Sequence, residues 1–141
     1  MTSLKESFIE VCKANNMNTD DFRFHKEDDM ETISWIEDKT GTDFIIIVAF
    51  IKHVHLGNIV EIVAHKGITV LDHDKSRLLE VLTAVNKANI EYTSMTFTYQ
   101  NDGIGVKLVQ EPSGNDEEDA LSILTLAYAG VSCLQHIKIG S

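Results

Sequence analysis

Hydrophobic residues recur along this chain with two different periods, and each change of period predicts a change of secondary structure. Near the N-terminus, Leu4, Phe8 and Cys12 fall at helical spacing, which predicts a helix that runs to about Ala14. Elsewhere apolar and polar residues alternate, as they do in strands. The predicted strands are Phe22–His25, Met30–Glu37, Phe44–Lys52, Ile59–His65, Tyr92–Tyr99 and Ile104–Val109. Two further helices are predicted over Lys75–Lys87 and Asp116–Ile137.

Capping and turn residues lie between these segments. The candidate helix N-caps are Thr2 or Ser3, Asp72 or Asp74, and Asn115 or Asp116. Tight turns are predicted at Glu27–Asp29, Lys39–Thr42, Leu56–Asn58 and Asn101–Gly103. Strands joined by short turns pair antiparallel, so the predicted fold is one α+β domain over residues 1–141. It consists of a twisted, mainly antiparallel sheet flanked by helices, in the order α-β-β-β-β-α-β-β-α.

Two of these elements carry apolar residues that predict how they are buried. The strand Phe44–Ile51 is apolar at every position, and a strand of that kind is expected to be covered on both faces. The middle helix is predicted to bury a face made of Leu78, Leu79, Leu82 and Val85. Asn86 and Asn89 are expected to mark its C-terminus, because asparagine tolerates a left-handed backbone.

The final helix has an unusually wide apolar surface. Its large apolar residues cover an arc of about 220°, against the ~100° stripe of an ordinary surface helix. They are Leu121, Ile123, Leu124, Leu126, Tyr128, Val131, Leu134 and Ile137. We therefore expect contacts on two sides, and the candidate partner-binding residues are Leu121, Leu124, Tyr128 and Val131. The alternative is that the N-terminal helix of the same chain covers them.

Composition narrows the classes of protein that remain. The chain is 43% hydrophobic and 24% charged, as in soluble globular domains, and its formal net charge is −10. An acidic surface repels phosphate, which argues against nucleic acid and against anionic membranes as partners. The longest apolar run, Phe44–Ile51, is too short to cross a bilayer. The N-terminus has no signal layout, so the expected location is the cytoplasm, where Cys12 and Cys133 stay reduced.

Residues with chemical potential are present, but none forms a convincing catalytic or metal motif. His53 and His55 share a strand face and, with Glu61, could form part of a metal site, or they could be solvated residues beside a turn. Asp72–Asp74 and Glu117–Asp119 fit helix starts better than ligand sets or acid–base pairs. Neither a nucleophile elbow nor a phosphate loop is present. No catalytic residue, metal or cofactor is predicted, and the chain is not expected to be an enzyme.

The second half of the chain also has a family resemblance. Leu78–Leu82 leads to Asn86–Asn89, and a hairpin, an acidic loop and a long helix follow. In this order the stretch Ser76–Ile137 resembles the YbjN family, bacterial domains described as putative sensory transduction regulators. The strands Phe22–His65 fit the same plan more loosely. The resemblance implies the fold of type III secretion chaperones, which are often dimeric and bind other proteins, and it implies no catalytic residues.

The leading hypothesis is thus a cytoplasmic protein-binding module of chaperone or regulator type, acting as a homodimer through apolar surface on its sheet and last helix. A second hypothesis is an acidic inhibitor or immunity-type protein that blocks a basic partner, which the charge of −10 permits. A third is a metal-dependent enzyme that uses His53, His55 and Glu61.

Overall fold

A computed structural model describes residues 3–39, 41–71, 73–100, 102–137 and 139 of the chain. The helices are α1 (Leu4–Ala14), the short 3-10 helix η1 (Thr19–Asp21), α2 (Lys75–Glu91) and α3 (Asp116–His136). The strands are β1 (Arg23–Glu27), β2 (Met30–Lys39), β3 (Thr42–His53), β4 (Gly57–Gly67), β5 (Thr96–Gln100) and β6 (Gly103–Gln110). Apart from η1, this is the predicted order of elements, and the predicted α+β class is confirmed.

In the described residues, the six strands form a single antiparallel sheet in the order β1-β2-β3-β4-β6-β5. The first four strands follow one another as hairpins. α2 then carries the chain past the sheet, so that β6 pairs with β4 and leaves β5 at the edge. The hairpin predicted at Asn101–Gly103 joins β5 to β6, with Asp102 in the left-handed region at φ 57°.

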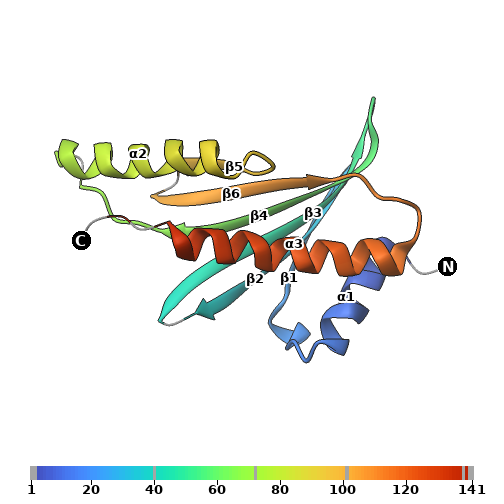
Figure 1. The fold of residues 1–141 in the computed structure, drawn as a ribbon. Coiled ribbons are helices and arrows are strands. Elements are labelled where there is room, and N and C mark those ends of the chain that lie inside the picture. Colours follow the sequence, from blue (N-terminus) through green and yellow to red (C-terminus); the bar gives the residue numbers. More distant parts are fainter. Residues whose placement is uncertain (1–2, 40, 72, 101, 138, 140–141) are drawn as a thin grey trace.

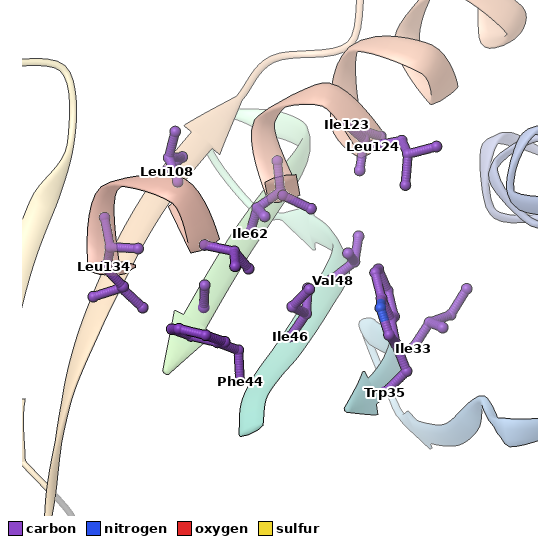
Figure 2. Packing of buried hydrophobic residues seen from close by; sticks show 14 of the residues in the cluster. Ile33, Trp35, Phe44, Ile46, Val48, Ile62, Leu108, Ile123, Leu124 and Leu134 are labelled. Carbon is purple, nitrogen blue, oxygen red and sulfur yellow. The ribbon is translucent and has the colours of Figure 1, made fainter. Parts of the chain in front are cut away.

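The core lies between one face of this sheet, here called the inner face, and the helices α1 and α3. α3 crosses the sheet (Figure 1), and its buried apolar residues belong to the same core cluster as those of the strands. Figure 2 shows Ile123 and Leu134 of α3 above Phe44, Ile46 and Ile62 of the central strands. Gly130 lets the helix come close, because a Cβ there would lie 3.2 Å from the Val106 side chain.

Side chains cap the three α-helices as their sequences suggest. Ser3 accepts a hydrogen bond from the backbone N–H of Glu6, and Asp74 accepts one from that of Arg77. Asn115 does the same for Glu118 at the start of α3. The alternative caps Thr2 and Asp72 lie outside the described residues.

The boundary between α2 and β5 differs from the prediction. α2 continues to Glu91 and β5 begins only at Thr96, so the predicted strand start at Tyr92 is wrong. Asn89 does not end the helix. Its side chain reaches the outer edge of β5, where Nδ2 donates to the Phe97 carbonyl at 2.9 Å and Oδ1 accepts from the Phe97 N–H at 2.7 Å. This amide takes the place of a neighbouring strand, and two tertiary hydrogen bonds outweigh the local preference of asparagine.

The face that α2 buries is only partly the predicted one, because Val85 is buried as predicted but the three leucines are not. Val81, Val85 and Ala88 are buried, whereas Leu78, Leu79 and Leu82 are exposed. The helix carries two apolar stripes, and the smaller side chains of Val81 and Ala88 fit the narrow space beside β5. The leucine stripe faces away from the fold.

The prediction that β3 is covered on both faces is wrong as well. Phe44, Ile46 and Val48 point inward and are buried, while Ile45 on the opposite face is 43% exposed. In the described part of the chain α1 and α3 pack on the inner side, and α2 packs beside β5 at the sheet edge. The outer face of β3 is therefore left without a covering layer.

Candidate functional site

The apolar surface of α3, the first candidate site, is divided between the core and the neighbouring helix. The sheet covers one side of α3, and α1 packs along another side near its N-terminal half. Ile123, Leu134 and Ile137 are buried, and Leu126 is half-buried. The second covering layer inferred from the wide apolar arc therefore comes largely from the same chain, as in the alternative reading of the sequence.

The four candidate partner-binding residues on α3 have different environments. Leu124 and Val131 are 4% and 1% exposed, so neither offers surface to a second molecule in this conformation. Tyr128 is half-buried. Leu121 is 54% exposed and is the one of the four that a partner could contact directly.

Tyr128 is held by a small polar network. Its hydroxyl donates to Oε1 of Glu37 at 3.1 Å, and the indole Nε1–H of Trp35 donates to the same oxygen at 3.0 Å. Burial, together with the Glu37 carboxylate, raises the pKa of Tyr128 to about 12. Tyr128 therefore ties α3 to β2 instead of facing a partner.

Leu121 lies at the edge of a groove between α1 and the N-terminal part of α3. The groove has a volume of about 1020 Å³, and we call it the helix groove. Val11 and Ala14 of α1 line its apolar side together with Leu121. Its charged lining consists of Glu10, Asp116 and Glu117, all of them acidic. A hydrophobic strip flanked by carboxylates thus runs between the two helices.

A second groove adjoins the first at Gly114 and Asp116. It has a volume of about 830 Å³ and lies between the start of α1, the β1–β2 turn and the far end of the β3–β4 hairpin, so we call it the hairpin groove. Half-buried apolar side chains line it, among them Leu4, Phe50 and Pro112. Its charged lining comprises seven carboxylates and three lysines, a net charge of −4.

The outer face of the sheet is an apolar surface that no helix of the described residues covers. Ile36 and Ile45 are paired across β2 and β3 and are 62% and 43% exposed. Half-buried Ile47 and Val63 continue the surface across β3 and β4. Its most central charges neutralise each other, because Lys107 and Glu61 form an ion pair at 3.1 Å.

The structure keeps two residues of the possible metal site together, since the ring centroids of His53 and His55 are 6.1 Å apart, but Glu61 lies farther along the hairpin. The β3–β4 turn lies at Val54–Leu56, slightly earlier than predicted, so His53 pairs with Gly57 and Glu61 pairs with Ala49. The imidazole Nδ1 of His53 accepts the backbone N–H groups of His55 and Leu56, which makes it part of the turn. Among the residues that the structure describes, no three His, Cys, Asp or Glu side chains are placed to share a metal ion.

The acidic run at the start of α3 contains a residue with a structural role that the sequence did not reveal. Asp119 is buried and accepts hydrogen bonds from the Ser113 hydroxyl at 2.7 Å and from the backbone N–H groups of Ser113 and Gly114. It therefore fixes the loop before α3, beyond any effect on the helix dipole. The sequence held a local signal for this role. Ser113 lies six residues before Asp119, and the N-cap of α3 lies between them.

Lys66 at the end of β4 is a second residue that sequence reasoning missed. Its Nζ donates to the carbonyls of Leu134 at 3.0 Å and Ile137 at 3.2 Å, at the C-terminus of α3. A cation there satisfies free carbonyls and opposes the negative end of the helix dipole. Burial lowers the pKa of Lys66. The contact joins residues about seventy positions apart, and no local pattern indicates it.

The two thiols are both unpaired and both sheltered. Cys12 is buried and Cys133 is half-buried, and neither takes part in a disulfide. Burial raises the pKa of Cys12 to about 12 and also raises that of Cys133. A thiol needs to ionise to act as a nucleophile, so at neutral pH both side chains behave as small apolar groups.

Comparison of the chain with known protein family models, with curated proteins and with solved structures finds no match. The YbjN resemblance and its implied secretion-chaperone likeness therefore stay predictions. None of the helices in the described part of the chain is long and apolar enough to cross a membrane.

Proposed function

We propose that this protein is a protein-binding module of chaperone or regulator type that works as a homodimer joined through the outer face of its sheet. One observation carries the proposal. β3 is apolar on both faces, yet its outer face has no covering layer in the described residues. An antiparallel sheet with one solvated face normally alternates apolar and polar residues, so this strand departs from the usual pattern. Burial against another protein accounts for the departure.

The charge of the face favours a second copy of the chain as the covering protein. At a net charge of −10, two copies repel each other unless their contact surface is close to neutral. The centre of the outer face meets that condition, because Lys107 pairs with Glu61 and the side chains around them are aliphatic or short and polar. A twofold axis through such a face gives a closed dimer, the commonest symmetric assembly.

Cytoplasmic location and the absence of catalysis belong to the same proposal. The free thiols of Cys12 and Cys133 fit a reducing compartment. The acidic inhibitor, the second function considered from the sequence, is favoured by one specific feature, the carboxylate-rich lining of the two grooves. A basic protein that binds there would be its target.

Light scattering on the purified chain tests the dimer. The expected result is twice the 15.8 kDa mass of one chain at micromolar concentration. Replacement of Ile36 and Ile45 by threonine keeps the β-branched shape that suits a strand and removes apolar surface. This double variant is expected to shift the dimer to monomer, with at least a tenfold weaker association.

The exposed leucine stripe of α2 supplies the matched control. Leu79 is 66% exposed on the far side of that helix, so Leu79→Ser removes comparable apolar surface from a different place. It is expected to leave the dimer intact. A monomeric wild-type chain contradicts the proposal, and so does a dimer that Leu79→Ser dissociates while the strand variant does not.

A further inference from the structure

The acidic charge of this chain is unevenly distributed, and its densest region coincides with the two grooves. Together the helix groove and the hairpin groove are lined by nine of the 22 Asp and Glu residues but by only three of the 12 Lys and Arg residues. More than half of the net charge of −10 is therefore gathered around two adjoining hollows.

In the described part of the chain, the basic residues in this region leave most of its carboxylates without an ion-pair partner. Lys5 and Lys26 both form ion pairs with the same carboxylate, that of Glu31, at 3.0 and 3.5 Å. The attraction of Lys5 and Lys26 holds the pKa of Glu31 below its ordinary value, so the group is ionised at neutral pH. Most of the carboxylates around the grooves remain available for a cation from outside.

The grooves also offer apolar contacts next to these charges. Leu121, Val11 and Ala14 line the helix groove, and Leu4 and Phe50 continue the apolar lining in the hairpin groove. A small hydrated cation would use the charges alone and gain nothing from this surface. A ligand that matches both features presents large apolar side chains on one side and cationic groups beside them.

The backbone around the grooves is largely satisfied, which limits the form of such a ligand. The loop that separates the two hollows has its N–H groups engaged, because Ser113 and Gly114 donate to Asp119 and Asn115 donates to the Ser113 hydroxyl. The other walls belong to helices and to strands of the sheet, and of these strands only β1, which contributes Lys26 and Glu27, lies at a sheet edge. An extended peptide would find few partners for its own N–H and C=O groups, whereas a helix satisfies them internally.

We propose that the two grooves bind a basic amphipathic helix of a partner protein. Its apolar stripe packs on Leu121, Val11 and Phe50, and its Lys and Arg side chains reach the carboxylates on both sides, Glu10 and Glu117 in the helix groove among them. This inference adds to the proposed function a second contact surface and names the chemistry of its partner. The helix groove lies on the helix side of the sheet, and the hairpin groove reaches Ile51 and Ile59 at the end of the outer face away from Ile45.

Binding is tested with a synthetic peptide of Leu and Lys arranged as an amphipathic helix, labelled for fluorescence anisotropy. A peptide of the same composition, with the residues reordered so that no apolar face forms, is the control for charge alone. The amphipathic peptide is expected to bind the full chain at least tenfold more tightly than the reordered one. Its binding is also expected to weaken as salt is added, while the amphipathic peptide still binds more tightly than the reordered one.

Charge reversal locates the site. Glu10→Lys with Glu117→Lys changes two carboxylates of the helix groove, and Asp20→Lys with Glu91→Lys changes two exposed carboxylates that line neither groove by the same total charge. The groove pair is expected to weaken peptide binding tenfold or more, against about twofold for the distant pair. Circular dichroism of both variants establishes that they keep the fold.

Leu121→Ser and Leu79→Ser form the matching apolar pair. The first is expected to weaken peptide binding and the second to leave it unchanged, while dimer formation is unaffected by either. Equal binding of the two peptides, equal effects of the two charge pairs, or no binding at low salt would each overturn the inference. Because the dimer is measured separately by light scattering, failure here leaves the proposed function standing, and the reverse also holds.

Discussion

At the scale of single residues, the polar groups that matter most to this fold join segments far apart in sequence. Glu37 accepts hydrogen bonds from Trp35 and Tyr128 on one oxygen, and Lys66 closes the end of α3. The Tyr128–Glu37 contact fixes α3 relative to β2, and the Lys66 contact fixes it relative to β4. A change at these residues is therefore expected to affect the whole inner layer, although neither lies in the middle of the apolar core.

The Tyr128–Glu37 contact predicts how stability depends on high pH. The folded pKa of Tyr128, about 12, lies above the ordinary tyrosine value of 10, so the folded chain holds this proton more tightly than the unfolded chain. That contribution is complete below pH 10 and is lost as the pH rises from 10 to 12. We expect the free energy of unfolding of the wild type to fall across this range, as measured by urea unfolding.

Two tyrosine variants test that assignment. Tyr128→Phe loses the hydrogen bond, which costs about 1 kcal/mol at neutral pH, and lacks this part of the decline between pH 10 and 12. Tyr99→Phe leaves Tyr128 in place and is expected to keep the decline. If both variants show the same pH profile as the wild type, the hydroxyl of Tyr128 is not held by Glu37 as described.

At the scale of elements, α2 and β5 depend on one asparagine. Asn89→Leu would leave the N–H and C=O of Phe97 without partners at the sheet edge, and we expect a loss of roughly 2 kcal/mol of unfolding free energy. Asn86 lies on the exposed face of the same helix, so Asn86→Ala should have no cost and should slightly favour the helix. Chemical denaturation measures both, and equal losses would show that the amide bridge contributes nothing.

The same helix shows what a single sequence can and cannot predict about burial. The period of Leu78, Leu79 and Leu82 correctly indicated a helix, because that period reflects local geometry. It did not indicate which stripe faces the fold, because Val81 and Ala88 fall at helical spacing with Val85 just as the leucines do. Which stripe is buried depends on the space beside β5. That space is a property of the folded sheet, and the sequence of α2 alone does not determine it.

The candidate sites show the same difference between what a sequence pattern predicts and what only the folded chain determines. The strand β3 was correctly recognised as apolar on both faces, but the sequence did not show that one face would stay uncovered. The wide apolar arc of α3 was also read correctly, and α1 turned out to cover much of it. The sequence named Leu121 together with the buried Leu124 and Val131, because the period of an apolar arc does not distinguish exposed residues from buried ones. Lys66 was missed because its role arises from a contact between distant parts of the chain, whereas the role of Asp119 had a local signal, the serine six residues before it, that was not used.

At the scale of the whole molecule, the crowding of carboxylates around the grooves should cost the folded state free energy when no partner is bound. Like charges that lie close together repel, and dissolved salt screens that repulsion. We expect sodium chloride to raise the midpoint of thermal unfolding, by roughly 3 °C for each kcal/mol recovered in a domain of this size. Calorimetry at low and moderate salt measures the change.

The location of the charges, and not their number alone, determines how much added salt raises the unfolding midpoint. Glu10→Lys with Glu117→Lys relieves repulsion inside the groove region, so its unfolding midpoint should respond less to added salt than that of the wild type. Asp20→Lys with Glu91→Lys removes as much net charge from positions outside the grooves and should keep most of the salt response. If the two pairs behave alike, the repulsion is spread over the whole surface of the protein. In that case it is not concentrated at the grooves, and a basic helix that binds there would not relieve it.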